Sequence, residues 1–195
     1  MTPSGKARAA CLLAALMLVL VSCTNGKQVA AYYAQRFPQG QLDTGYLNQI
    51  SSSTARARYY LAGNTARSFS PGHGTQIEYT DTNGNAFLWY PGNSRIVVGK
   101  WRTQNRQGNV EVCFLYPQDT LNPVTQEVGG NWECMAAKAA FAFDYERVRG
   151  NPFGLKAGSV PVPIARQQNV SFLELRRDFG IVTPILERLP TPRSF

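Results

Sequence analysis

Residues 75–116 read TQIEYTDTNGNAFLWYPGNSRIVVGKWRTQNRQGNVEVCFLY and carry a series of β-strand signals. Hydrophobic and polar residues alternate in 75–80 and again in 109–116, which is the pattern of a strand with one buried face. Asn83-Gly84 and Pro91-Gly92 separate the runs, and such pairs are typical of tight turns. Four strands at a spacing of about ten residues predict an antiparallel meander or a small barrel-like sheet.

Short helices are predicted on either side of these strands. Hydrophobic residues recur at helical spacing in 28–37, and residues 42–50 predict one or two further helical turns. Ser171 and Glu174 occupy the capping-box positions of a short helix over 171–178. The fold class that follows is α+β, an antiparallel sheet with short flanking helices.

The segment 135–148 carries two opposing signals. Its alanines favour a helix, which we predict here, whereas Phe141, Phe143 and Tyr145 alternate as they would in a strand. Residues 159–164 predict an edge strand that tolerates its prolines. The proline-containing C-terminal end predicts an irregular tail.

The N-terminus is typical of a secretion signal. Lys6 and Arg8 precede an apolar run of about a dozen residues, which is too short for a transmembrane helix. The run ends in Leu20-Val21-Ser22-Cys23, which resembles the lipobox of bacterial lipoproteins. That resemblance implies that Cys23 is acylated and becomes the first mature residue; the alternative is an ordinary signal peptidase site followed by a free thiol. An Asp directly after the lipobox cysteine would resemble a signal for retention in the inner membrane, and this chain has Thr24 there. The resemblance therefore implies the periplasmic face of the outer membrane of a Gram-negative cell.

This interpretation divides the chain into four parts and fixes the charge of the mature protein. The parts are a signal peptide, a lipid anchor with a tether and helix, a β-rich globular domain, and a short helix with a proline-containing tail, at 1–22, 23–40, 41–165 and 166–195. Removal of the signal leaves 18 basic and 12 acidic residues, a net charge of +6. Acylation would hold this basic domain on a membrane surface.

The remaining cysteines form an even set in an oxidising compartment. With Cys11 in the signal and Cys23 acylated, Cys113 and Cys134 are left, and we predict that they form a disulfide. Closing a loop of this length contributes on the order of 3 kcal/mol of stability. Metal binding is the weaker alternative, because two cysteines and one distant histidine cannot complete a four-ligand zinc site. We expect no metal and no cofactor.

Short motifs across residues 58–156 are similar to a family of small secreted bacterial domains of unknown function. The motifs are Leu61-Ala62-Gly63-Asn64-Thr65, Glu78-Tyr79, Asn83-Gly84, Gly99-Lys100-Trp101, Val112-Cys113-Phe114-Leu115-Tyr116 and Trp132-Glu133-Cys134. The resemblance implies a small β-sheet fold and an exported location, and it implies no reaction. Where family members carry Gly-Asp-x-Phe, this chain has Gly150-Asn151-Pro152-Phe153, which lacks the carboxylate.

Catalytic chemistry has few candidates in this sequence. A nucleophilic serine or cysteine site would have to use His73, the single histidine, and no Gly-x-Ser-x-Gly motif accompanies it. A glycosidase needs two carboxylates, which Glu78 with Asp81 or Asp144 with Glu146 could supply. Any chain with twelve acidic residues offers such pairs, so we predict no catalytic residues.

Arginine and aromatic residues give the remaining functional signal. Arginine outnumbers lysine by 15 to 5, and guanidinium groups pair with carboxylates or phosphates and stack on aromatic rings. The alternative is a solvated rim that reflects genomic base composition. The residues predicted to bind a partner are Arg56, Arg58, Tyr59, Arg95, Trp101 and Arg102.

The expected function is therefore that of a lipid-anchored, non-catalytic binding or accessory module of the cell envelope. Its partner would be an anionic glycan, a lipid headgroup or an acidic protein, and the compartment argues against nucleic acid. Two alternatives stay open: an envelope-polymer hydrolase that uses His73 or a carboxylate pair, and a carrier that holds an apolar ligand.

Replacing Cys23→Ser tests the lipid anchor. The variant should take up no palmitate analogue in metabolic labelling and should move from the membrane to the soluble fraction, because the acyl chains supply the membrane affinity. A membrane-bound variant together with an unlabelled wild type would contradict the prediction.

Overall fold

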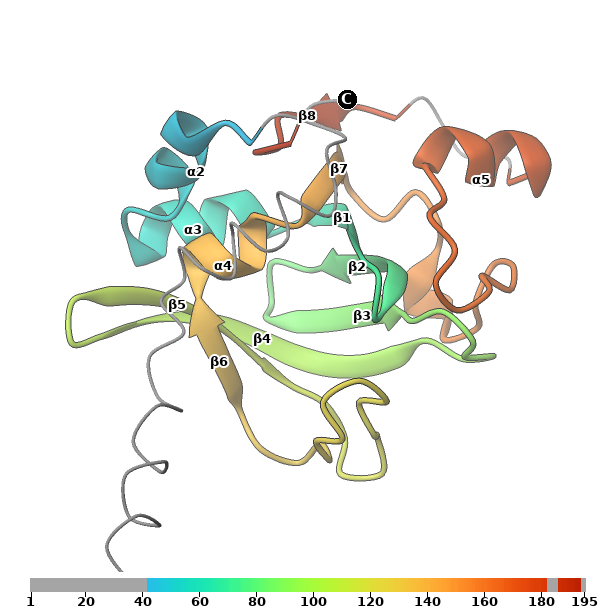
Figure 1. The fold of residues 1–195 in the computed structure, drawn as a ribbon, viewed down its shortest axis with the longest axis horizontal. Coiled ribbons are helices and arrows are strands. Elements are labelled where there is room, and N and C mark those ends of the chain that lie inside the picture. Colours follow the sequence, from blue (N-terminus) through green and yellow to red (C-terminus); the bar gives the residue numbers. More distant parts are fainter. Residues whose placement is uncertain (1–41, 182–185, 194–195) are drawn as a thin grey trace, which may run out of the picture. The chain divides into compact units, whose positions relative to one another are not determined.

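A computed structural model describes residues 42–181 and 186–193 (Figure 1). The expected signal peptide, Cys23 and the helix predicted over 28–37 lie outside the described residues. Within them, no helix combines the length and the apolar character needed to cross a membrane. The elements are α2 (Thr44–Ile50), α3 (Thr54–Leu61), β1 (Asn64–Ser70), β2 (Gly74–Thr80), β3 (Asn85–Trp89), β4 (Val97–Arg106), β5 (Asn109–Leu115), β6 (Glu133–Ala136), α4 (Ala137–Phe141), β7 (Asp144–Arg149), the 3₁₀ helix η1 (Leu155–Ala157), α5 (Phe172–Asp178) and β8 (Arg188–Leu189).

The described strands form one curled antiparallel sheet in the order β6-β5-β4-β3-β2-β1-β7-β8. The strands β2 to β5 are the predicted meander, so the predicted α+β class is confirmed. The turn between β2 and β3 forms because the Asp81 carboxylate accepts hydrogen bonds from the backbone N–H groups of Asn83 and Asn85. Gly84 has a φ of 83°, a conformation that glycine adopts without strain.

Two hydrophobic clusters pack on opposite faces of the sheet. We call the face that α2, α3 and α4 cover the inner face, and the opposite one the outer face. The inner cluster joins those helices to β3, β4 and β5 through Ala86, Trp101 and Val112. The outer cluster joins η1 and α5 to β2, β3 and β7, with Ile77 and Trp89 at its centre. The C-terminal helix therefore belongs to the same core as the strands.

The prediction of one helix over 135–148 is half wrong. The segment contains the end of β6, the five-residue α4, and then β7, which pairs with β1 along its length. The helix propensity of the alanines is realised only in α4. In β7, pairing with a neighbouring strand and burial of both faces override the helix propensity. The connection through α4 carries the chain from one edge of the sheet towards the other.

Three further elements differ from the predictions. The helix α3 was not predicted; Ser53 caps it by accepting a hydrogen bond from the Arg56 N–H, so the polar break before it is a helix start. Residues 159–164 form only an isolated bridge, from Ser159 to Arg95, and no strand. The C-terminal segment adds β8, and Arg193 is buried with its Nε donating to the Ala142 carbonyl at 2.6 Å.

The helix α5 confirms its predicted start. Ser171 and Glu174 form the capping box, in which the Ser171 hydroxyl accepts from the Glu174 N–H and the Glu174 carboxylate accepts from the Ser171 N–H. The next backbone N–H, that of Phe172, donates to Glu146 of β7 at 2.8 Å. A carboxylate buried at a helix start offsets the positive end of the helix dipole. The strand and the helix are thus joined at one carboxylate.

Glu146→Gln tests how far the fold depends on buried charge. Glu146 also pairs with Arg67 at 2.8 Å, and both side chains are less than 10% exposed. The substitution should lower the free energy of unfolding by about 3 kcal/mol, because it leaves a buried guanidinium without its counter-charge. Chemical denaturation measures this, with Glu187→Gln in the exposed Arg149 pair as the control that should change little. Equal effects of the two substitutions would contradict the prediction.

Candidate functional site

The six residues predicted to bind a partner do not gather into one patch. Trp101 and Arg102 follow each other on β4, so their side chains point to opposite faces of the sheet. Trp101 is 2% exposed in the inner cluster, and its indole N–H donates to the Asp81 carbonyl at 3.0 Å. It is therefore a core residue and is not available to a ligand.

Three of the six lie together on α3. Arg56, Arg58 and Tyr59 are exposed, Tyr59 at 81%. The Arg58 guanidinium lies over the Trp101 ring at 5.2 Å and donates to the Thr82 carbonyl at 2.9 Å, which anchors α3 to the turn between β2 and β3. This surface belongs to the inner side of the sheet, away from Arg102.

The outer face of β4 carries a row of alternate residues that the structure leaves uncovered. We call this the outer row, made up of Val98, Lys100, Arg102, Gln104 and Arg106. Val98 is 47% exposed, and the three cations are exposed. Within the described residues, none of these cations forms an ion pair with an acid. The row is therefore a line of positive charge without internal neutralisation.

Trp132 gives the outer row an aromatic neighbour. Its ring lies beneath the Arg102 guanidinium, 4.2 Å from Cζ to the ring centroid, and 36% of the residue is exposed. Next to it along the row, the Lys100 ammonium donates to the Asn85 side chain at 2.5 Å. Stacking holds the guanidinium plane while its edge remains free to donate hydrogen bonds.

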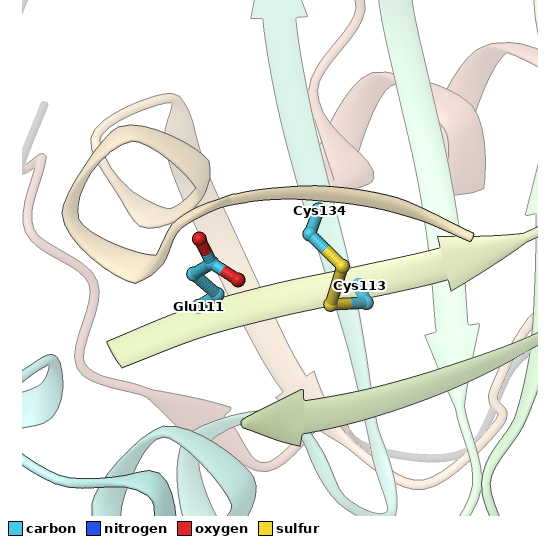
Figure 2. A group of neighbouring side chains, drawn as sticks. All are labelled: Glu111, Cys113 and Cys134. Atoms are coloured by element: carbon cyan, nitrogen blue, oxygen red, sulfur yellow. A yellow bond between two sulfur atoms is a disulfide. The ribbon is translucent and has the colours of Figure 1, made fainter. Parts of the chain in front are cut away.

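The predicted disulfide lies beside this row. Cys113 of β5 and Cys134 of β6 are direct partners in the sheet and form the bond, as Figure 2 shows together with Glu111. Both sulfurs are consumed, so the three residues offer only one free carboxylate to a metal. That carboxylate accepts from the Gln104 amide at 2.8 Å, which places an acid next to the outer row.

A hollow of about 420 Å³ lies at the start of β4. It is lined by residues 92–98 and by Pro117, Asp119 and Thr120 from the segment that follows β5. Arg95, the last of the six predicted residues, lines it and is exposed. Val98 belongs both to this hollow and to the outer row, so the two features are continuous.

A carboxyl–phenol contact spans the inner face. The Tyr116 hydroxyl donates to Glu78 at 2.5 Å, although β3 and β4 lie between their strands. The curl of the sheet brings the two side chains together, and Gly99 leaves room for the ring, since a Cβ at that position would lie 2.7 Å from it. Burial raises the pKa of Glu78 to about 7, while the Tyr116 hydrogen bond opposes this rise.

Of the two carboxylate pairs considered for hydrolysis, Asp144 and Glu146 lie on opposite faces of the sheet, and Asp81 of the other pair is engaged in a turn. A bulge where β7 pairs with β1 sends Asp144 to the inner face, where it accepts from the Tyr60 hydroxyl at 3.0 Å and pairs with Arg147. Glu146 is directed to the outer cluster. The Asp81 carboxylate is occupied by its own turn, and hydrogen bonds there hold its pKa below the usual value.

His73 is half-buried and paired with a phenol. Its Nδ1 lies 2.9 Å from the Tyr90 hydroxyl, and the two rings meet edge to face. Burial lowers the pKa of His73, which favours the neutral ring. The Ser70 hydroxyl accepts from the His73 backbone N–H at 3.4 Å, whereas the described hydrogen bond of the ring itself is to Tyr90 and not to a serine or cysteine.

Three features of these sites are not among the sequence-based predictions: the outer row, the Arg102–Trp132 stack and the Glu78–Tyr116 contact. Strict alternation along 98–106 marks the outer row, and applied to Trp101 it would have placed that side chain on the buried face. The Arg102–Trp132 stack and the Glu78–Tyr116 contact carried no sequence signal, because each joins residues from separate strands or loops.

The Glu78 carboxyl should make the free energy of unfolding depend on pH. Its folded pKa lies above the unfolded value of about 4.5, so the folded state binds more protons and loses stability as the pH rises from 5 to 8. Relative to Glu78→Gln, the wild type should lose on the order of 2 kcal/mol over this range, allowing for partial solvent access.

Denaturation midpoints at each pH measure this loss. Tyr116→Phe serves as the matched control, because loss of the hydrogen bond to the carboxylate should move the transition to higher pH. If the denaturation midpoints of the wild type and Glu78→Gln change in parallel with pH, the predicted contribution of Glu78 to pH-dependent stability is wrong.

The chain was compared with protein-family models, with curated proteins and with solved structures, and none of the three comparisons finds a match.

Proposed function

We propose that this chain is a lipid-anchored envelope protein whose domain binds an anionic partner through the outer row and Trp132 and converts nothing. The observation that carries the proposal is the Arg102–Trp132 stack beside Lys100, on the part of the outer face over β4, where neither η1 nor α5 packs in the described part of the chain. Cys23, outside the described residues, would supply the anchor, with the outer membrane facing the periplasm as the location.

The stack favours binding because it orders a cation in advance. A free arginine side chain loses roughly 2 kcal/mol of rotamer entropy when it is immobilised. The Trp132 ring already restricts Arg102, so less of this cost remains when a carboxylate or phosphate docks. Lys100, held at Asn85, adds a second charge two residues away on the same face.

Net charge supports the same conclusion. The mature chain carries +6, and three of its twelve acids, Glu146, Asp144 and Glu187, each pair with an arginine away from the outer row. The outer row thus keeps its cations for an external partner. Individual exposed pairs are weak, so several cations must act together.

The hydrolase remains a second candidate because of one observation. Glu78, with a pKa of about 7, has the protonation behaviour of a general acid near neutral pH. Its nearest carboxylate on the inner face is Asp144, which Arg147 and Tyr60 already occupy. Neither His73 nor a second free carboxylate joins Glu78 in the described contacts, so binding is the better-supported function.

Charge reversal tests the surface assignment. Lys100→Glu with Arg102→Glu should elute from a sulfated polyanion resin at clearly lower salt than the wild type, because the outer row loses its ordered cations. Arg56→Glu with Arg58→Glu, on α3, carries the same net charge and is the matched control, with circular dichroism to confirm folding.

If both double variants lower the eluting salt concentration equally, net charge alone explains the effect, and the assignment of binding to the outer row is contradicted. A larger shift for the α3 pair would move the binding surface there. His73→Ala should elute with the wild type.

A further inference from the structure

We propose, on the basis of the function proposed above, that the partner is a linear acidic saccharide, a chain of sugars carrying carboxylate or phosphate groups. It lies along β4 over the outer row and Trp132, and it ends in the hollow beside Arg95.

The residues of the outer row follow one another at the regular spacing of a single strand, which suits a linear polymer. Alternate residues of a strand stand about 6.7 Å apart, so Lys100, Arg102 and Arg106 mark a line of about 20 Å. A polymer with repeating charges can meet each of these cations in turn. Gln104 interrupts the line with an amide, which is turned towards Glu111 of the neighbouring strand.

Trp132 suits a sugar more than a simple anion. The part of its ring that remains exposed offers an apolar surface at the middle of the charged row, next to Arg102. Sugar rings have apolar C–H faces as well as polar edges, so one unit of the chain can pack on the indole while its acid group reaches the guanidinium.

The hollow has the composition of a site for the end of such a chain. Arg95 supplies a cation, and Asn93, Ser94 and Thr120 supply amide and hydroxyl groups. Asp119 in the same wall can accept hydrogen bonds from sugar hydroxyls. Ile96, Val97, Val98 and Pro117 complete the lining, so a saccharide finds donors, acceptors and an apolar wall in the same hollow.

The surroundings disfavour an anionic bilayer as the partner. Apart from Val98 in the row itself, the exposed aliphatic residues Leu121, Val124 and Val128 belong to the segment between β5 and β6. That segment also carries the acids Asp119 and Glu127 and has no cation between residues 117 and 132. Residues able to enter the apolar layer would therefore bring negative charge against negative lipid.

Calorimetric titration can test the partner class. The full mature chain, made soluble by Cys23→Ser, is titrated with hexameric oligogalacturonate, with hexaglutamate, and with phosphatidylglycerol vesicles at equal charge concentration. The hexauronate should bind at least roughly ten-fold more tightly than the other two, a difference that corresponds to about 1.4 kcal/mol.

Variants then locate the saccharide. Lys100→Glu with Arg102→Glu should lose at least about ten-fold in affinity for hexauronate, and Trp132→Ala and Arg95→Ala roughly five-fold each. Arg56→Glu with Arg58→Glu is the control and should lose much less.

The outcomes separate the two proposals. If hexaglutamate or the vesicles bind as tightly as hexauronate and the outer-row variant abolishes that binding, the saccharide is wrong and the anionic surface stands. If the outer-row variant changes nothing with any of the three probes, both proposals fall. If hexauronate is preferred but Trp132→Ala and Arg95→Ala bind it like the wild type, its placement along β4 is wrong.

Discussion

Two acids of β7 form buried ion pairs on opposite faces of the sheet. A bulge at Tyr145 is what directs their side chains to different faces. In a regular strand, Asp144 and Glu146 would share a face; the extra residue sends one to each side. Asp144 joins Arg147 beneath α3, and Glu146 joins Arg67 beneath the start of α5. One strand thus fixes the helices of both layers through charges that would be costly to bury alone.

The same strand β4 serves the core and the surface. Its inward residues, Gly99 and Trp101, shape the inner cluster and leave space for the Tyr116 ring. Its outward residues stay open, because η1 and α5 pack on β2, β3 and β7 and not on β4. Substitutions at even-numbered positions of β4 should therefore have little effect on the fold, whereas substitutions at Gly99 and Trp101 should destabilise it.

The predictability of each element follows the range of the interaction that forms it. The meander and the α5 cap depend on neighbours within a few residues, so alternation and turn chemistry were sufficient. The strand β7 forms by pairing with β1 across about 80 residues, and local propensity pointed the wrong way for it. For the site, Arg102 and Arg95 could be named from composition, whereas Trp132 joins the row only through the fold. Trp101 is predicted to bind a partner, but its position on the buried face of β4 makes it a core residue.

The outermost strands of the sheet are short: β6 has four residues and β8 has two. Unpaired backbone at a sheet edge is a template on which another chain can add a strand, and the hazard grows with the length of the edge. Proteins at high local concentration meet one another often. A sheet of this width that offers so little open backbone at either side is protected from edge-to-edge aggregation, even where its copies are crowded together.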